Sequence, residues 1–304
     1  GGLLDASGYL KYAAIAAPLM ALSILVSTAG THGRIYTLVA PPPPPKEPLL
    51  QTVRNMLATL FHRTNAPLLL GSIFGSMSGG LSAALNIYMQ TYFWELTSKQ
   101  IALLTSSGLL GVLLAFVVVL PLSKLFGKKW TTLTLYFITM LAIVVPVALR
   151  LIGLFPSNES PALVPLLFAF ATLTIMAVIA AAILTASMVA DVTDQIQLKT
   201  GRQSEGLIFS ATTFVNKTVS GMGILVSGLL LTVVGFPEDA KPGAVDLSTI
   251  NELAVVFAVS IAGFVTTALI IMSFYPVSHA DHQYAVEELA RRRAEGLSPP
   301  KGAR

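Results

Sequence analysis

The stretch 206–235, "GLIFSATTFVNKTVSGMGILVSGLLLTVVG", has the length and the apolar character of a helix that crosses a membrane. About 20 apolar residues are needed to cross roughly 30 Å of hydrocarbon, and this stretch exceeds that length. Its centre is occupied by Lys217, and no Asp or Glu lies within eleven residues of that lysine on either side. The stretch therefore predicts a membrane fold, and the presence of a cation in the middle of the span needs an explanation.

Six further stretches of similar length and composition occur along the chain of 304 residues. The whole sequence is 54% hydrophobic and 11% charged, with a mean hydropathy of +0.74, so it is far more apolar than a water-soluble domain. None of the stretches alternates polar and apolar positions as the strands of a membrane barrel do. We therefore predict an all-α integral membrane protein with seven spanning helices, at 8–29, 66–94, 101–123, 131–154, 162–190, 206–235 and 251–275.

The longest polar interruption, 31–64, separates the first span from the other six. It contains "APPPPPKEP" at 40–48, and consecutive prolines favour an extended polyproline conformation over a helix. We expect a semi-rigid spacer between two helix bundles. Four parts follow: the last helix of a truncated N-terminal bundle (1–30), a cytoplasmic Pro-rich linker and helix (31–64), a C-terminal six-helix transport bundle (65–276) and a cytoplasmic tail (277–304).

The distribution of basic residues predicts the orientation of the spans. Of the nineteen Lys and Arg residues, fourteen fall in one alternate set of loops and the tail, and four fall in the other set. Cytoplasmic loops carry the excess of Lys and Arg in membrane proteins, so the linker and the C-terminus are expected in the cytoplasm. Basic residues interleaved with aromatic ones, which would suggest nucleic acid, are not found.

Lys217 is the residue whose position is hardest to explain as packing alone. A charge near the bilayer midplane costs at least about 2.5 to 3.5 kcal/mol, so it is expected to face a bundle interior or a water-filled cavity and to have a partner. Small and polar residues fall within a right angle of it around the helix: Ser210, Thr213, Ser220, Gly221, Ser227 and Gly228. Two interpretations remain open, a purely architectural ion pair or snorkelling lysine and a lysine in a central transport cavity.

The stretch 66–94 carries two further patterns. Gly71, Gly75 and Gly79 recur every four residues and Ala83 continues the series, which is typical of closely packed helices in lipid. The end of the same stretch, "ALNIYMQTYFW", offers Asn86, Tyr88, Gln90 and Tyr92. Rings beside hydrogen-bonding groups suit a sugar, and Tyr and Trp at this depth also form the ordinary aromatic belt of membrane proteins.

A charged segment follows the fifth predicted span, "ADVTDQIQLKTGRQSEGLIFS" at 190–210. Its carboxylates and basic groups either pair with one another in a solvated loop or take part in a functional contact. Elsewhere no nucleophile stands beside a base, no glycine loop could cradle a phosphate, and the absence of cysteine excludes thiolate metal sites. The sequence therefore predicts no enzyme and no cofactor.

These residues resemble the glycoside, pentoside and hexuronide:cation symporter family of the major facilitator superfamily. The family pattern AD-x-x-D, a short basic loop and E-G before helix eleven is matched by Ala190, Asp191, Asp194, Thr200, Gly201, Arg202, Glu205 and Gly206. A Thr and a Lys four residues apart follow, as Thr213 and Lys217 do here. One departure is the loop "LSKLFGKK" at 122–129, where Lys124 and Leu125 replace the Asp-Arg of many facilitators.

The resemblance implies that the chain holds helices six to twelve of a twelve-helix transporter in a bacterial inner membrane. Such proteins bind their substrate between two symmetry-related bundles and expose it alternately to each side. The implied function is symport of a sugar or glycoside with Na⁺ or H⁺, with membrane lipid and the missing N-terminal bundle as partners. The implied cavity residues are Lys217, Thr213, Ser210, Ser220, Asn86, Tyr88 and Tyr92, with Thr213 as a ligand for the coupling ion. Asp191, Asp194, Arg202 and Glu205 would form the cytoplasmic gate.

Two alternative functions remain open on the sequence alone. Members of the resembled family include lipid carriers, so transport of a lysolipid or another amphiphile is the first alternative. A membrane module that binds a ligand without transporting it is the second.

Overall fold

The computed structural model describes residues 6–37, 48, 54, 58, 60–200, 205–237, 240–241, 243–276, 287–288 and 291. Within these ranges the regular elements are helices and no strand occurs, so the prediction of an all-α fold is confirmed. The proline run of the linker, Arg202 and most of the tail lie outside the described residues.

The chain divides into two compact units, Gly1–Thr52 and Val53–Arg304. The first unit contains α1 (Ala6–His32) and a one-turn 3₁₀ helix, η1 (Ile35–Thr37). Apolar side chains such as Leu19 and Leu25 are exposed around α1, and a helix that is apolar on all sides is typical of a membrane span. The predicted first span, 8–29, therefore lies within α1.

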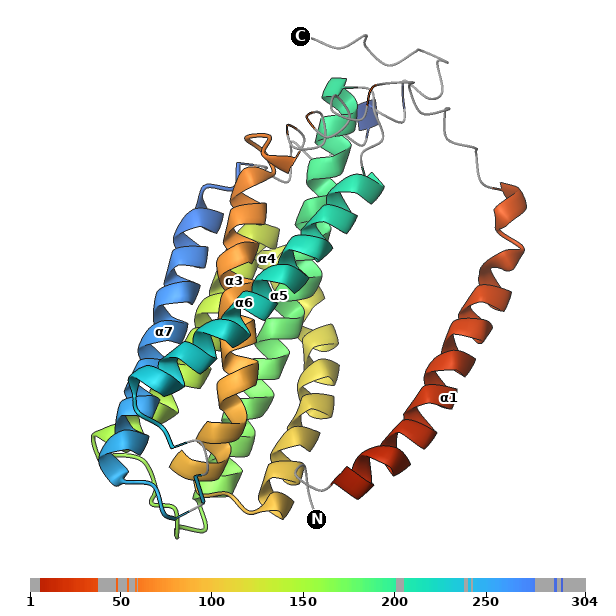
Figure 1. Ribbon diagram of the computed structural model, residues 1–304. Helices are drawn as coiled ribbons and strands as arrows, with labels where there is room; N and C mark the ends of the chain where they lie inside the picture. The colour runs from red at the N-terminus through yellow and green to blue at the C-terminus, as the bar shows by residue number, and fades with distance from the viewer. Residues whose placement is uncertain are drawn as a thin grey trace. The chain divides into compact units, whose positions relative to one another are not determined.

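The second unit is a bundle built from α3 to α7 (Figure 1). Helix α3 (Ala66–Tyr88) continues into a π-helical turn, η2 (Met89–Phe93), in which each turn holds an extra residue. The remaining helices are α4 (Ser98–Leu151), α5 (Leu163–Thr200), α6 (Glu205–Val233) and α7 (Leu247–Ser273). Helix α5 extends ten residues beyond the predicted span 162–190, so Asp191 and Asp194 lie on a helix and not in a loop.

Helix α4 contains two spans joined at Gly127. Its 54 residues would extend about 81 Å if straight, more than twice the thickness of the hydrocarbon core. Gly127 has a φ of 76°, a backbone conformation that favours glycine. The Oγ1 of Thr131 donates to the carbonyl oxygen of Leu122 at 3.0 Å, a contact between residues nine apart that a straight helix cannot make. The chain therefore reverses at Gly127.

This reversal reconciles the helices with the predicted number of spans. Six helices in the described part of the chain are long and apolar enough to cross a membrane, and one of them, α4, accounts for two crossings. The predicted spans 101–123 and 131–154 correspond to its two arms. The first arm begins with a capping box in which Thr97 accepts from the backbone N–H of Gln100 at 3.4 Å.

Helix α3 packs against both α6 and α7, and α6 crosses it in the view of Figure 1. A Cβ added at Gly80 would meet the backbone of Ser220, with the carbonyl carbon at 2.9 Å. A Cβ at Gly223 would lie 2.9 Å from the backbone nitrogen of Leu81. At Gly71 the obstacle is the side chain of Met272 on α7. At Gly80 and Gly223 the backbones of α3 and α6 approach too closely for any residue larger than glycine.

The prediction that glycines at every fourth position of α3 mediate packing is confirmed at Gly71, whereas two others meet no other helix of this chain among the described residues. No heavy atom lies within 4 Å of the place where a Cβ would stand at Gly75 or Gly79. The close crossing with α6 is made one residue further on, at Gly80. Periodicity identified a glycine-rich face, but the helix is rotated so that another glycine meets α6.

Candidate functional site

Lys217 lies in the middle of α6 and is exposed within this chain. It stands twelve residues after Glu205, about 18 Å along the helix. The face of α6 that packs on α3 contains Gly223 and the buried Ser227, and Lys217 lies about a third of a turn around the helix from Gly223. Lys217 therefore does not point into the contact between α6 and α3.

The predicted small and polar stripe around Lys217 divides into two groups. Ser220 and Ser227 belong to the packed side, where the Oγ of Ser227 donates to the carbonyl oxygen of Ile224 at 2.6 Å. The other members are exposed and share the helix face of the lysine. They are Ser210, Thr213, Gly221 and Gly228.

Within the described residues, Lys217 makes no recorded hydrogen bond or ion pair. The ion pairs given by the described residues join Lys128 to Asp191 and Arg291 to Glu288, and neither involves Lys217. The expected partner of Lys217 is thus not found in the described part of this chain. This agrees with a partner on another bundle.

Helix α3, which neighbours α6, presents a face of small and polar side chains. Its members lie on one side of the helix and are exposed or half-buried. They are Ser72, Gly75, Ser76, Gly79, Ala83, Asn86 and Gln90. The sequence indicates Asn86 but not Ser72 and Ser76, because the recurring glycines on the same face are typical of packing positions. A face of this composition is unsuited to lipid tails.

Tyr88 and Tyr92 lie apart from Asn86 and form an aromatic cluster with Phe236. The ring centroids of the two tyrosines are 6.1 Å apart, and Phe236 lies edge-on at 5.4 Å from Tyr88 and 5.0 Å from Tyr92. The hydroxyl of Tyr92 donates to the carbonyl oxygen of Ala240 at 2.9 Å. The two rings therefore tie the end of α3 to the segment after α6, and the structure does not bring them together with Asn86.

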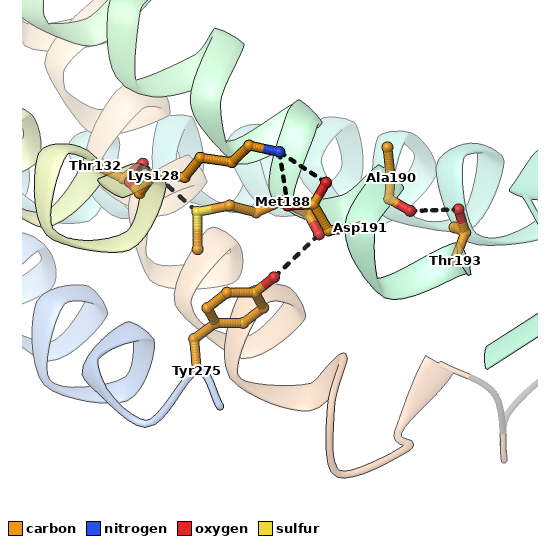
Figure 2. Close-up of polar contacts among 7 residues, drawn as sticks. All are labelled: Lys128, Thr132, Met188, Ala190, Asp191, Thr193 and Tyr275. Carbon is orange, nitrogen blue, oxygen red and sulfur yellow. Dashed lines mark hydrogen bonds and ion pairs between the residues drawn. The ribbon is translucent and has the colours of Figure 1, made fainter. Parts of the chain in front are cut away.

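A second polar cluster lies at the other end of the bundle, around Asp191 (Figure 2). Asp191 is 6% exposed, and both of its carboxylate oxygens accept from the Nζ of Lys128, at 2.8 and 2.7 Å. Because Lys128 follows the reversal at Gly127, this ion pair fastens the turn of α4 to α5. Sequence reasoning missed Lys128, since three lysines stand in that loop and nothing in their order indicates which one reaches Asp191.

Tyr275 joins the same cluster from the end of α7. Its hydroxyl donates to the carbonyl oxygen of Met188 at 3.4 Å, and its own carbonyl accepts from the Nζ of Lys129 at 2.9 Å. Burial raises the pKa of the Tyr275 hydroxyl far above its usual range, and the negative charge of Asp191 raises it further. The hydroxyl therefore stays protonated and keeps its role as a donor.

The predicted gate residues meet this cluster only in part. Asp191 is paired inside the bundle with Lys128, and Asp194 is half-buried three residues further along α5. The side chain of Glu205 and all of Arg202 lie outside the described residues. The contact of Asp191 with Lys128 therefore joins helices of one bundle, and the part of these residues in a cytoplasmic gate stays a prediction.

The sequence profile of the family described as MFS/sugar transport protein matches residues 1–279. The chain belongs to this family. The resemblance drawn from the Asp191 motif and from Lys217 is thereby confirmed at the level of the family. MFS/sugar transport proteins are integral membrane transporters and not enzymes, which agrees with the helices long enough to span a membrane.

Curated relatives in this MFS family carry the names of symporters and importers. The uncharacterized symporter YjmB of Bacillus subtilis is 28% identical over 261 residues, which are 82% of this chain and 51% of that protein. The putative sulfoquinovose importer of Escherichia coli is 24% identical over 224 residues, 71% of this chain and 44% of that protein. The chain thus spans about half the length of these relatives.

The ion pair between Lys128 and Asp191 should stabilise this MFS bundle measurably. Asp191→Asn or Lys128→Gln should each lower the free energy of unfolding by roughly 1 to 3 kcal/mol, less than for a fully buried pair because the Lys128 side chain is 30% exposed. The double variant should lose less than the sum of the two single losses. Denaturation in detergent with a double-mutant cycle measures this coupling.

The pair of Arg291 and Glu288 provides the control for this cycle. It joins residues three apart at 2.9 Å, and the Arg291 side chain is 61% exposed. Arg291→Gln should cost no more than about 1 kcal/mol. Equal losses at Lys128 and Arg291 would show that the contact with Asp191 adds nothing beyond a pair whose basic partner is largely exposed.

Proposed function

We propose that the intact protein is a secondary active transporter that couples the entry of Na⁺ or H⁺ to the uptake of a sugar or glycoside by alternating access. In this proposal the chain contributes the C-terminal bundle, in a bacterial inner membrane with the linker and the tail in the cytoplasm. The observation that carries the proposal is the position of Lys217, at mid-span on an exposed face of α6.

The exposed faces of α3 and α6 need a polar neighbour. A lone cation in hydrocarbon is costly, and hydroxyl and amide groups gain no hydrogen bonds from lipid tails. These two helices pack against each other, so Lys217 and the polar face of α3 lie on neighbouring elements. A second bundle that encloses water and substrate against these faces would satisfy both, which is the arrangement of transporters with two related bundles.

The chemistry of coupling follows from the charge of Lys217. Carboxylates supplied by the N-terminal bundle would pair either with this ammonium group or with the coupling cation. Binding of Na⁺ or H⁺ would release Lys217, and that change of partner can favour one orientation of the bundles over the other. Thr213, one turn away and exposed on the same face, would add a hydroxyl oxygen to the cation site.

The choice of a sugar as substrate is supported by the residues of α3 and by the relatives. Ser72, Ser76, Asn86 and Gln90 offer hydroxyl and amide groups that can exchange hydrogen bonds with sugar hydroxyls. The Oγ of Ser72 is presently satisfied by the carbonyl oxygen of Leu69 at 2.8 Å, a bond it can give up when a ligand enters. The family is described as a sugar transport family, and one relative is named as a sulfoquinovose importer.

Transport by reconstituted vesicles tests this function. The intact polypeptide should accumulate a labelled sugar or glycoside above its external concentration when an inward Na⁺ or H⁺ gradient is imposed. Accumulation should vanish when an ionophore dissipates that gradient. Equilibration without accumulation would refute coupling, accumulation of a lysolipid in place of every sugar tested would refute the substrate class, and binding without entry would refute transport.

A further inference from the structure

A pocket of about 660 Å³ opens beside the reversal of α4, at the same end of the bundle as Asp191. It is lined by residues before and after Gly127, together with residues from α5 and from the end of α7. The lining includes Lys124, Phe126, Lys128, Lys129, Trp130 and Asp191. The transport proposal makes no use of this space.

The pocket carries an excess of positive charge. Lys128 is neutralised by Asp191 through two bonds shorter than 3 Å. Lys129 gives one N–H to the carbonyl oxygen of Tyr275, so its charge is not neutralised and two further N–H groups remain. Lys124 is exposed and has no hydrogen bond or ion pair among the described residues. Two uncompensated ammonium groups therefore stand in one pocket, which suits an anion.

The rim of the pocket is apolar and aromatic. Phe126 and Trp130 are 62% and 63% exposed, although they are among the largest apolar side chains of the segment. The Nζ of Lys129 lies 5.7 Å from the centre of the Trp130 ring. Exposed Trp beside Lys is typical of the boundary between hydrocarbon and lipid headgroups. A soluble anion would gain nothing from such a rim, whereas a lipid would cover it.

The position of the reversal places the pocket at this boundary. The arm of α4 from Ser98 to Gly127 is about 43 Å long, which is enough to cross the hydrocarbon core and reach the headgroups. Helix α7 also ends here, at Ser273, just before Tyr275. The excess of Lys and Arg assigns this end to the cytoplasmic side, where anionic lipids attract basic segments.

We infer that this pocket binds the phosphate group of an anionic phospholipid, with Lys124 and Lys129 as its cationic partners and Trp130 and Phe126 against the glycerol and upper acyl chains. The inference does not rest on the transport proposal. Since the pocket joins the α4 reversal, α5 and the end of α7, a bound lipid would brace the two helices that the ion pair of Asp191 joins and the end of α7, which Tyr275 and Lys129 attach.

Native mass spectrometry of the delipidated full-length protein tests this site. The protein is titrated with phosphatidylglycerol and with phosphatidylcholine of identical acyl chains. The wild type should prefer phosphatidylglycerol, and Lys124→Gln with Lys129→Gln should weaken phosphatidylglycerol binding by roughly 30-fold, as expected for two lysines near a membrane surface. The Lys124→Arg, Lys129→Arg variant keeps both charges and should keep the preference.

A matched control removes two charges elsewhere on the same side. Arg54 and Arg63 are exposed and do not line the pocket. The Arg54→Gln, Arg63→Gln variant should retain the preference for phosphatidylglycerol. An equal loss in this control, or no loss in the Lys124, Lys129 variant, would overturn the site.

Two further measurements separate a lipid from a free anion and locate its binding. Inorganic phosphate in large excess should leave phosphatidylglycerol bound, and displacement by phosphate at the concentration of the lipid would overturn the lipid assignment. Phosphatidylglycerol should slow hydrogen exchange of backbone amides around Gly127 in the wild type and not in the glutamine variant. Equal slowing in both proteins would place the lipid elsewhere and overturn the site.

Discussion

Lys217→Ala in the intact transporter should abolish accumulation of substrate against its gradient, leaving at most equilibration across the membrane. Lys217 is proposed to exchange partners with the coupling cation, so its removal takes away the competition through which the cation biases the two orientations. Coupling free energies between two ligands are commonly 1 to 3 kcal/mol, or about 5- to 150-fold in affinity. We expect the effect of Na⁺ or H⁺ on sugar affinity to fall by a factor in that range.

The measurement pairs vesicle uptake with sugar binding at low and high cation concentration. Because the side chain is exposed within this bundle, Lys217→Ala should leave the amount of folded protein unchanged. Lys217→Arg retains the charge and should retain part of the cation effect. Lys99, exposed at the start of α4, is the matched control, and Lys99→Ala should behave as wild type. Undiminished accumulation by Lys217→Ala would contradict the proposed role.

Gly80→Ala and Gly223→Ala should be the most destabilising single-methyl changes in the bundle. The added carbon would collide with backbone atoms of the facing helix, which cannot rotate away as a side chain can. Separating α3 from α6 to make room should cost roughly 1 to 3 kcal/mol for each change. The thermal midpoint in detergent and the recovery of monodisperse protein report this loss.

Three other glycines of the same helices supply the controls. Gly79 and Gly228 have no heavy atom within 4 Å of an added Cβ, so alanine there should be neutral or slightly stabilising for the fold, because alanine favours a helix over glycine. Gly71→Ala should be intermediate, since its obstacle is the flexible side chain of Met272. Equal losses of stability from alanine at Gly79, Gly80, Gly223 and Gly228 would contradict the close crossing of α3 and α6.

The number and order of the spans could be predicted from the sequence because the thickness of the membrane sets the length of each apolar segment at about 20 residues. No knowledge of contacts between helices is needed. The two arms of α4 were separated correctly for this reason, although its helical assignment continues through Gly127. Long-range partners could not be predicted in the same way. Lys128 lies 63 residues from Asp191, and the adjacent Lys129 has the same chemistry but contacts Tyr275.

The rotation of each helix about its axis was also beyond the sequence. On α6, the predicted stripe was broad enough to include the packed Ser220 and the exposed Thr213. On α3, the change to a π-helical turn at Met89 alters the direction of every later side chain, so Tyr92 could not be placed by counting residues. Composition identifies a polar face. The direction in which that face points depends on helices that are distant in the sequence and pack against it.

Two of the contacts that close the ends of the bundle involve main-chain carbonyl groups. Tyr92 donates to the carbonyl oxygen of Ala240, and Lys129 donates to that of Tyr275. Every amino acid supplies such an oxygen, so substitution at position 240 removes no acceptor. Residue 240 can therefore change its side chain without loss of this hydrogen bond, whereas the attachment of the segment to α3 also needs the rings of Tyr88, Tyr92 and Phe236.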